Sequence, residues 1–349
     1  MKCTIQNIAD HLGLSRNTVS KALKNSSEVS ENTRNLVIKT ASKLGYKNAT
    51  FATPVIPASE IGSNGTILFL TRTYASDSEF WTTVLRGIES ILSNANYHLA
   101  ISIMSDSDLK QLNFPQTISD SSIKGIILVE ICDKVVCDAL SQFNLPIVSV
   151  DMPNVPFEEL NGIDVVTMES KKNLKKIINQ LIEKGAESFG FVGDLYSPNV
   201  SRGFQERYNA LSECLAEHQL PLNQKNCLLH QTPEDFRNFQ TTVNNLQAMI
   251  SLPDVFICGN DWTAIQLIYA LQFLGFQIPK DICVVGFDNI PAASRISPSL
   301  TTISTPQKYL GIAAARQILE RIQHPNCPHV FCQYETELII RNSTNIISF

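Results

Sequence analysis

The residues best suited to chemistry near the start of the chain are polar side chains that can read DNA. Arg16 and Asn17 are adjacent, and Lys21 follows within the same predicted helix. In the major groove an arginine can bond bidentately to guanine, and an asparagine can do the same to adenine. The polar face that we predict to meet DNA consists of Arg16, Asn17, Thr18, Ser20 and Lys21. The alternative is an amphipathic helical hairpin whose polar face is simply solvated.

Two short helices are expected to position these side chains. One face of the first helix carries the apolar residues Ile5, Ile8, Ala9 and Leu12. Gly13 permits the positive φ that ends this helix, and Ser15 is a suitable N-cap for the second. The apolar face of the second helix consists of Val19, Ala22 and Leu23. Two short helices joined by a glycine-containing turn are the helix-turn-helix pattern. Ser30 is expected to cap a third helix that ends near Leu44 and Gly45.

Charge is distributed unevenly along the 349 residues. Residues 1–50 hold eight Lys or Arg and three Asp or Glu, whereas the rest of the chain holds 20 basic and 30 acidic residues. A basic start on an acidic body is typical of a small phosphate-contacting module that is joined to a domain without a nucleic-acid role. The length also exceeds that of one ordinary domain.

After position 65, strand and helix patterns alternate. Strands are predicted at 66–71, 99–104, 125–129, 147–150, 165–168, 189–192, 255–258 and 282–287. Helices are predicted near 80–93, 171–184, 203–217, 234–249, 262–274 and 307–322. Such alternation predicts parallel sheets covered by helices on both faces, and it is too long for one sheet. The expected fold class is therefore α/β, with two doubly wound parallel-sheet lobes preceded by a small all-α helix-turn-helix domain.

Several polar residues directly follow predicted strands in the body. They are Asp151, Asp194, Asn260, Asp261 and Asp288. Ligands of open parallel sheets bind outside the carboxyl ends of the strands, so these side chains could converge between the lobes. Asp and Asn offer the donors and acceptors that a hydroxyl-rich ligand needs. Aromatic faces could come from Phe80, Trp81 and Phe236. Capping of a following helix is an equally good interpretation of each polar residue, and Asp261 is expected to cap the helix at 262–274.

Longer motifs make a resemblance visible. Residues 4–46 contain Gly13-Leu14-Ser15, Thr18-Val19-Ser20 and Leu44-Gly45-Tyr46, and the body contains Gly259-Asn260-Asp261 and Val284-Val285-Gly286-Phe287-Asp288. In combination these motifs resemble the LacI/GalR family of bacterial transcriptional regulators over nearly the whole chain. The resemblance implies a helix-turn-helix headpiece at 1–46, a linker or hinge at 47–65, and an effector-binding and dimerisation domain at 66–349. That domain is expected to be similar to periplasmic sugar-binding proteins.

The resemblance also implies how the lobes divide and what the linker does. Lobe one would hold about 66–164 and 290–322, and lobe two about 165–289 and 323–349. In this family the linker forms a hinge helix on DNA and places a leucine in the minor groove, where this chain has Val55. Asn48 replaces the usual proline and Pro54 would disturb a helix, so we expect the hinge helix to be weak. The full set of expected DNA contacts is Thr4, Ser15, Arg16, Asn17, Thr18, Ser20, Lys21, Asn25 and Val55.

The same resemblance assigns effector contacts residue by residue. They are Phe80, Trp81, Asp151, Phe236, Asn260 and Asp288. Arg207 fits the effector arginine of an R-x-x-G-[FY] motif in which Ala210 replaces the glycine, and Arg202 is a rival for the same role. The implied protein is a homodimer that binds near-palindromic double-stranded operator DNA and responds to a small polar effector, with a sugar favoured. A regulator that senses a purine or nucleoside is the alternative, and a sugar-binding protein without a DNA role is a further one.

Other functional classes find little support. The chain has no G-x-G-x-x-G after the first strand, no P-loop and no G-x-S-x-G, so neither nucleotide binding nor catalysis is expected, and no cofactor. Nine cysteines without a C-x-x-C pair indicate free thiols in a reducing compartment. The spacing of Cys327 and Cys332 near His324 and His329 fits no metal site that the chemistry supports. Without a signal-peptide pattern or a bilayer-spanning apolar run, a cytoplasmic protein with no membrane partner is expected.

Overall fold

The computed structural model describes residues 4–23, 26, 29–30, 33–34, 36–37, 40–41, 63–72, 78–195, 201–230 and 238–344. The chain forms two compact units, Met1–Gly62 and Ser63–Phe349, called here the N-terminal unit and the body. Three predicted site residues lie outside the described residues, namely Asn25, Val55 and Phe236. Positions 47–62 of the predicted linker, with its hinge helix, also lie outside them.

The N-terminal unit contains the two predicted short helices, α1 (Ile5–Leu12) and α2 (Arg16–Leu23). Gly13 has a φ of 64° and ends α1, because glycine adopts this conformation without strain. At the start of α2, the Ser15 hydroxyl accepts a hydrogen bond from the Thr18 backbone N–H at 3.0 Å. The described residues between positions 33 and 41 are helical, and Ser30 accepts from the Thr33 N–H at 3.4 Å. The buried core of the unit consists of Ile8, Ala9, Val19, Ala22, Val29, Val37 and Ala41.

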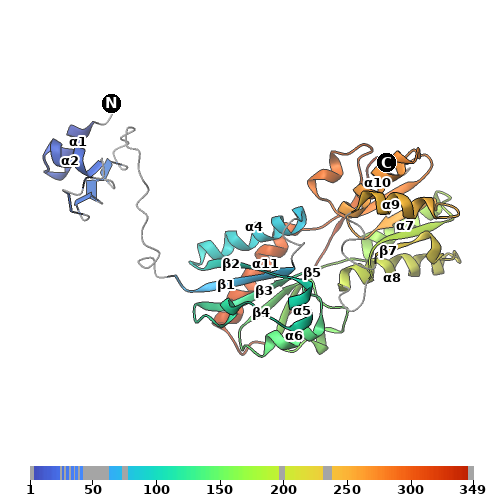
Figure 1. Ribbon diagram of the computed structural model, residues 1–349, viewed down its shortest axis with the longest axis horizontal. Helices are drawn as coiled ribbons and strands as arrows, with labels where there is room; N and C mark the ends of the chain where they lie inside the picture. Colours follow the sequence, from blue (N-terminus) through green and yellow to red (C-terminus); the bar gives the residue numbers. More distant parts are fainter. Residues whose placement is uncertain are drawn as a thin grey trace. The chain divides into compact units, whose positions relative to one another are not determined.

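The first sheet of the body is entirely parallel. Its strands, in spatial order, are β11 (Phe331–Tyr334), β5 (Ile163–Met168), β4 (Ile147–Val150), β3 (Ile123–Val129), β1 (Thr66–Arg72) and β2 (His98–Met104). Alternate residues of β1 point to opposite faces, because strand side chains have a period of two. One face of the sheet is covered by α4 (Glu79–Asn94) with α11 (Gln307–Gln323), and the other by α5 (Asp106–Gln111) with α6 (Lys134–Ser141) (Figure 1). Ile67 and Phe69 belong to the core beneath the first of these helix pairs, and Leu68 and Leu70 belong to the core beneath the second. The sheet and these helices form lobe one.

The second sheet is parallel except at one edge. Its strands, in spatial order, are β12 (Glu337–Ile339), β10 (Thr301–Ser304), β9 (Cys283–Asp288), β8 (Val255–Cys258), β6 (Phe189–Asp194) and β7 (Leu228–His230), with β12 antiparallel to β10. Its helices are α7 (Lys172–Glu183), α8 (Arg202–Glu217), α9 (Phe239–Gln247) and α10 (Asp261–Phe273), and together they form lobe two (Figure 1). Short 3-10 helices occupy Gln116–Ser119, Phe157–Glu159, Gln224–Asn226 and Pro291–Ser294. The predicted class, α/β with two doubly wound sheets after a small helical domain, is confirmed.

The sheets correct the predicted division of the lobes. The boundary expected between 164 and 165 falls inside β5, which belongs wholly to the first sheet. β10 lies in the second sheet although 290–322 was assigned to lobe one, and β11 lies in the first sheet although 323–349 was assigned to lobe two. The physical reason is that β10, β11 and β12 have three or four residues each, too few for a hydrophobic pattern to show which sheet they join.

In the part of the body that the structure describes, the chain passes between the lobes three times. The crossings follow β5, β10 and β11, and the last two contain only residues 305–306 and 335–336. The first and third crossings are bonded to each other. Glu169 N–H donates to the Tyr334 carbonyl at 2.8 Å, and the Asn173 side-chain amide donates to the Thr336 carbonyl at 2.7 Å. The connections between lobes are therefore short and mutually braced.

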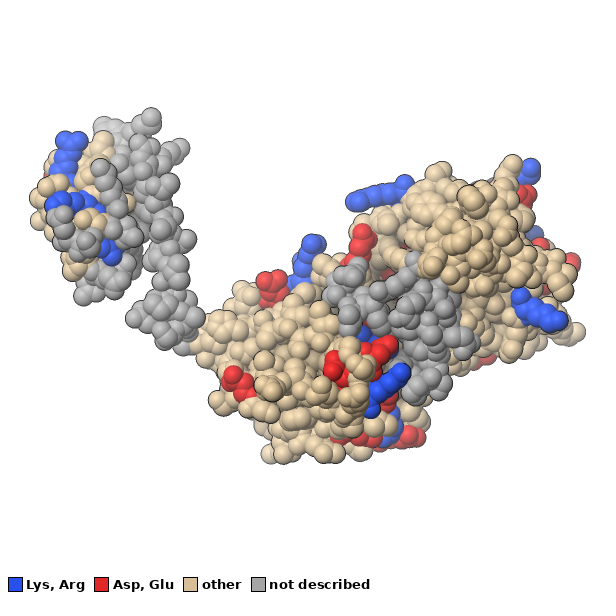
Figure 2. Space-filling view, in the orientation of Figure 1, with Lys and Arg blue, Asp and Glu red and all other residues tan. Residues whose placement is uncertain are grey.

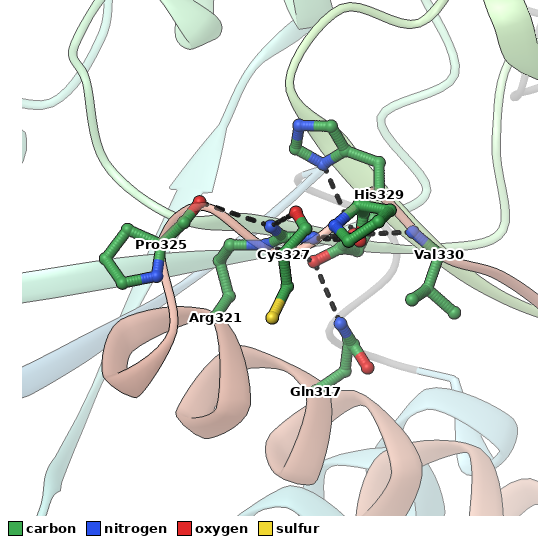
Figure 3. Close-up of polar contacts among 8 residues, drawn as sticks. Gln317, Arg321, Pro325, Cys327, His329 and Val330 are labelled. Atoms are coloured by element: carbon green, nitrogen blue, oxygen red, sulfur yellow. Dashed lines mark hydrogen bonds and ion pairs between the residues drawn. The ribbon is translucent and has the colours of Figure 1, made fainter.

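A buried ion pair fixes the end of α11 against the first sheet (Figure 3). Asp164 on β5 is fully buried, and its two carboxylate oxygens accept from Arg321 Nη2 at 2.8 Å and Nε at 3.0 Å. Arg321 also donates to the carbonyls of Pro325, Cys327 and Pro328. Burial alone would raise the pKa of Asp164, but the bonds from Arg321 and from the Val330 N–H leave that pKa below its ordinary value.

Candidate DNA-binding and effector sites

The first turn of α2 presents the predicted DNA-reading side chains. Arg16 and Asn17 are exposed there, whereas Val19 and Ala22 on the opposite face are buried in the core. The remaining polar residues of this face are half-buried: Thr18, Ser20 and Lys21. Figure 2 shows Lys and Arg side chains gathered on the N-terminal unit. The arrangement suits a recognition helix, in which residues near the N-terminus contact base edges.

Three other polar residues of this unit have structural tasks. The Thr4 hydroxyl accepts from the Asn7 N–H while the Asn7 side chain accepts from the Thr4 N–H, which closes a capping box on α1. Ser15 caps α2. Arg34 donates from Nη2 to the carbonyls of Ser26 and Val29, at 2.7 and 3.0 Å, and so fastens the loop before the third helix. Thr4 and Ser15 therefore cap helices, and they also remain predicted DNA contacts.

In the body, four charged residues define the strand-end cluster: Glu130, Asp151, Arg207 and Asp288. Glu130 and Asp151 directly follow β3 and β4 of the first sheet, and Asp288 ends β9 of the second. All three carboxylate residues have a positive φ, at 57°, 75° and 116°. Such backbone conformations in residues other than glycine are uncommon and concentrate at functional sites. The two sheets thus direct carboxylates toward one place from their carboxyl ends.

Arg207 on α8 supplies the positive charge of this cluster. Its side chain is 3% exposed, its guanidinium lies 3.6 Å from the centroid of the Phe287 ring, and Nη1 donates to the Gly259 carbonyl at 2.6 Å. Burial lowers the pKa of Arg207, and the nearby charges of Asp288 and Asp151 oppose that shift. Its Nε has no hydrogen-bond acceptor within the described part of the chain. The predicted effector arginine is therefore a buried cation held among carboxylates of both lobes.

Arg202, the rival arginine, lies at a different place. Its Nε pairs with Glu206 at 2.8 Å, and its guanidinium lies 5.3 Å from the centroid of the Phe331 ring. Its backbone N–H donates to the Met152 carbonyl at 3.0 Å, beside an antiparallel bridge between Pro153 and Ser201. The Arg202 side chain is 32% exposed. Arg202 thus belongs to a contact between the lobes, next to the strand-end cluster, whereas Arg207 lies inside the cluster.

Asn260, and not Asp261 as the sequence suggested, caps α10. Asn260 is the N-cap of α10, and its side chain accepts from the Thr263 N–H at 2.9 Å. Asp261 is fully buried and accepts from the Thr302 hydroxyl at 2.5 Å and the Ile290 N–H at 2.9 Å. Burial raises the pKa of Asp261 to about 7 despite these bonds. The expectation that Asp261 caps α10 is wrong, because the helix begins one residue earlier than predicted and Asp261 faces the sheet.

The predicted aromatic pair lies under the strand-end cluster. Phe80 and Trp81, in the first turn of α4, are 6% and 7% exposed. Their rings pack edge to face, with the ring centroids 4.6 Å apart. The Trp81 indole N–H donates to Glu130 Oε1 at 2.5 Å. Glu130 was not among the predicted site residues, although it directly follows a strand as Asp151 does. The same sequence signal would have found it.

Burial governs the electrostatics of the cluster. It raises the pKa of Glu130 to about 7, against the opposing effects of the Trp81 hydrogen bond and the charge of Arg72, and the charges of Asp151 and Asp194 add to the rise. Burial also raises the pKa of Asp151 and of Asp288, in spite of Arg207. Each of these carboxyl groups is therefore influenced by the charges of the others, and all are partly desolvated.

The described residues offer few other sites. They contain no group of three His, Cys, Asp or Glu residues that could hold a metal ion, and no helix long and apolar enough to span a membrane. A surface hollow of about 440 Å³ is lined by residues that include Ile250, Leu252, Phe276 and Ile282. These residues precede β8 and β9 or belong to the loops there, at the amino ends of the strands. The hollow is thus separate from the strand-end cluster.

Comparisons with known proteins agree with this architecture. Residues 4–48 match the family model of bacterial regulatory proteins of the lacI family, and residues 178–344 match that of the periplasmic binding protein-like domain. Curated relatives include a PurR transcriptional repressor of Photobacterium profundum, 26% identical over 97% of this chain and 98% of the relative. The ribose operon repressor of Haemophilus influenzae is 27% identical over the same shares.

Solved structures show the same fold over 81% to 99% of this chain. A CelR–cellobiose complex superimposes with a TM-score of 0.69 at 19% identity, covering 98% of this chain and all of the other. The lac repressor dimer bound to operator gives 0.68 at 18% identity and 99% of both chains. A LacI family regulator of Enterococcus faecium with bound ribose gives 0.66 at 24% identity, covering 81% of this chain and all of the other. The chain thus joins a helix-turn-helix domain of the lacI family of bacterial regulatory proteins to a periplasmic binding protein-like domain, and relatives that match nearly its whole length are transcriptional repressors.

Proposed function

We propose that this regulator is a repressor whose affinity for operator DNA is set by a sugar bound at the strand-end cluster. The observation that carries the proposal is the convergence of Asp151, Arg207 and Asp288, which come from both lobes and interact electrostatically. Carboxylates and a guanidinium are the acceptors and donors that a polyhydroxyl ligand requires. The exposed Arg16 and Asn17 on α2 provide the means to read the operator.

A sugar fits the cluster better than a purine or nucleoside. In the described part of the chain, the two predicted aromatic residues, Phe80 and Trp81, are almost fully buried and the Trp81 N–H is already bonded to Glu130, so neither offers an open face on which a base could stack. The similar solved structures include complexes with cellobiose, with ribose and with D-xylulofuranose. PurR and the ribose operon repressor both appear among the relatives, so a purine stays the second candidate. Catalysis has no part in the proposal, since the relatives are repressors.

The contacts of Asp288 link a bound ligand to the connection between the lobes. Its backbone carbonyl accepts from the Gln307 side-chain amide at 2.7 Å and from the Thr305 hydroxyl at 3.2 Å, in the crossing that leads to α11. A ligand held by the Asp288 carboxylate would therefore act next to the residues that join the lobes. The ligand can shift the equilibrium between two arrangements of the lobes only by the difference in its affinity for them. In a homodimer, such a change would alter how two N-terminal units meet the half-sites of a near-palindromic operator.

The proposal is tested by measuring operator binding with and without sugars. Operator sites are first selected from random DNA with the full-length protein, and binding is then followed by fluorescence anisotropy while sugars, purine bases and nucleosides are added. We expect one sugar class to change the operator Kd at least tenfold and to raise the Tm of the protein, because ligand binding stabilises the folded state by mass action. A response to purines alone would replace the sugar with the second candidate. No specific operator, or no response to either class, would refute the proposal.

A further inference from the structure

We propose that Asp261 and Asn289 are positioning residues of the effector site, because they hold the backbone turn that directs Asp288 into the strand-end cluster. This turn consists of Asp288 and Asn289, at the end of β9. The inference rests on the proposed sugar site, and it names residues that set the affinity of the site without binding the sugar themselves.

The turn has a backbone conformation that needs support from its surroundings. Asp288 and Asn289 have φ values of 116° and 55°, two consecutive positive values in residues that carry a Cβ. Such conformations are sparsely populated for residues other than glycine, and they persist where the surrounding structure fixes them. Because the backbone of Asp288 sets the direction in which its carboxylate leaves β9, the bonds that hold the turn also place this carboxylate.

Asp261 is the first anchor of the turn. It is the fully buried first residue of α10, and its two carboxylate oxygens accept from the Ile290 N–H at 2.9 Å and from the Thr302 hydroxyl at 2.5 Å. The first bond fixes the residue that follows the turn, and the second joins it to β10. Since Asp261 has no exposed surface and both of its oxygens are bonded, it can affect a ligand only through Asp288.

The second sheet leaves space for the Asp261 carboxylate at a glycine. A Cβ on Gly286, within β9, would overlap with Asp261 Oδ1, so a larger residue at this position would displace the carboxylate. Gly286 lies beside Thr302 in the register of β9 and β10. The Asp261 carboxylate therefore lies against two adjacent strands, on the side from which it reaches the Ile290 N–H.

Asn289 provides the second anchor through its side-chain amide. Its Nδ2 donates to the Ser304 hydroxyl at 3.1 Å, and its Oδ1 accepts from Arg341 Nη2 at 2.6 Å. Arg341 is itself held, because its Nη1 donates to the Leu300 carbonyl at 2.8 Å. Ser304 lies beside Asp288 in the register of the two strands. Asn289 thus connects the turn to the end of β10 and to the segment that follows β12.

The anchors affect affinity because they order the turn before a ligand arrives. A sugar that meets an ordered Asp288 carboxylate does not lose binding free energy in fixing its position. If one anchor is removed, the turn can relax from its positive φ values, and binding must restore them. Loss of either anchor should therefore weaken the sugar complex even though neither Asp261 nor Asn289 is a sugar ligand.

The test compares sugar affinity with thermal stability in the full-length protein. The probe is whichever of D-ribose, D-glucose, D-galactose and cellobiose raises the wild-type Tm most, and its Kd is measured by calorimetry. We expect Asp261→Ala to weaken binding about tenfold, because it removes the acceptor for the Ile290 N–H. Asp261→Asn keeps an oxygen for that N–H and an amide that can donate to the Thr302 hydroxyl, so its Kd should stay within about threefold of wild type.

Asn289→Gly gives a second measurement that does not depend on how well Asp261→Ala folds. Glycine adopts a positive φ without strain, so the turn can still form but lacks the bonds to Ser304 and Arg341. We expect severalfold weaker sugar binding at a Tm within about 2 °C of wild type. A purely structural residue would not change the Kd at a nearly constant Tm.

Asp254→Ala is the matched control. Asp254 directly precedes β8, and its Oδ2 accepts from the N–H groups of Glu187 and Ser188 at 3.0 and 2.8 Å, at the amino ends of the strands. Like Asp261, it is a carboxylate that holds backbone N–H groups, but it lies at the opposite end of the sheet. This variant should lower the Tm and leave the sugar Kd unchanged.

Hydrogen exchange tests the turn without any sugar. The Ile290 amide should exchange faster in Asp261→Ala than in wild type, because its acceptor is gone. If wild type binds the probe and both Asp261→Ala and Asn289→Gly bind it equally well, the inference is overturned while the sugar-responsive function stands. If wild type binds none of the four sugars, the proposed function is contradicted, and unchanged exchange at Ile290 would then overturn the role of Asp261 in the turn as well.

Discussion

Arg321 offers the sharpest test of what holds lobe one together. Replacing it with methionine would leave Asp164, which is fully buried, without its cation and the carbonyls of Pro325 and Pro328 without a donor (Figure 3). Removing one partner of a buried pair costs about 3–5 kcal/mol, because the remaining charge is left uncompensated. For a body of this size, about 2 °C of Tm corresponds to 1 kcal/mol, so we expect Arg321→Met to lower the Tm by roughly 6–10 °C.

The control is an ion pair whose side chains are exposed to solvent instead of buried. Lys172 and Glu335 lie 3.1 Å apart, but their side chains are 68% and 70% exposed. Exposed pairs contribute about 0–1 kcal/mol, so Lys172→Met should lower the Tm by about 2 °C or less. The double variant Asp164→Asn with Arg321→Met keeps an acceptor for the Val330 N–H and removes the buried charge. It should therefore be more stable than Arg321→Met alone.

Acid titration gives an independent readout of the same pair. The pKa of Asp164 is lower in the folded protein than its ordinary value, so its ionised form stabilises the fold above the pKa of the unfolded chain, near 4. That stabilisation is lost as the pH falls through the folded pKa. The difference in unfolding free energy between wild type and Arg321→Met, measured by urea denaturation, should be largest near pH 8. It should shrink as the pH falls, first because the uncompensated Asp164 of the variant takes up a proton and then because wild-type Asp164 is protonated as well. An Arg321→Met protein no less stable than Lys172→Met would refute the reasoning.

Three shorter predictions concern DNA binding and the response to the effector. Arg16→Ala should cost about 1–3 kcal/mol on the selected operator and relax one base position, and unchanged base preference in site selection would exclude a reading role. Ser15→Ala removes the cap of α2 and should weaken the protection of its amides from hydrogen exchange by about 1 kcal/mol; equal protection in both proteins would show that the cap is dispensable. Asp288→Asn should abolish the sugar response of operator binding and change the sugar-free operator affinity less than twofold, and a retained response at wild-type sugar concentrations would place the effector elsewhere.

The sequence predicted well those features that depend on neighbouring residues. Gly13 and Ser15 mark the turn between α1 and α2 because the required φ and the cap are local properties. The long apolar runs of β1 and β3 were recognisable because both faces of these strands are buried. The start of α10 was predicted one residue too late, and for this reason the cap was assigned to Asp261 instead of Asn260.

Features that depend on distant residues were not predictable in this way. The pairing of β11 with β5 and of β12 with β10 joins segments that are far apart in the chain, and the strands themselves are very short. The ion pair of Asp164 with Arg321 has the same character. Glu130 directly follows a strand, as Asp151 does, so the same rule could have selected it. Its place in a cluster of charged residues, however, can be recognised only when the neighbouring strands of the sheet are known.

The return of the chain to lobe one through α11 and β11 has a consequence for protein synthesis. The strands β1 to β5 leave the ribosome first, but the helix that packs beside α4 and the strand that covers the edge of β5 are translated more than a hundred residues later. Until then, the face of the first sheet that carries Ile67 and Phe69 lacks α11, and β5 has an open edge, both of which favour association with other chains. The described core of the N-terminal unit lies wholly within residues 5–41, so it can form as soon as these residues emerge. In a nascent chain, the DNA-reading N-terminal unit would therefore be folded before the body that is proposed to control it.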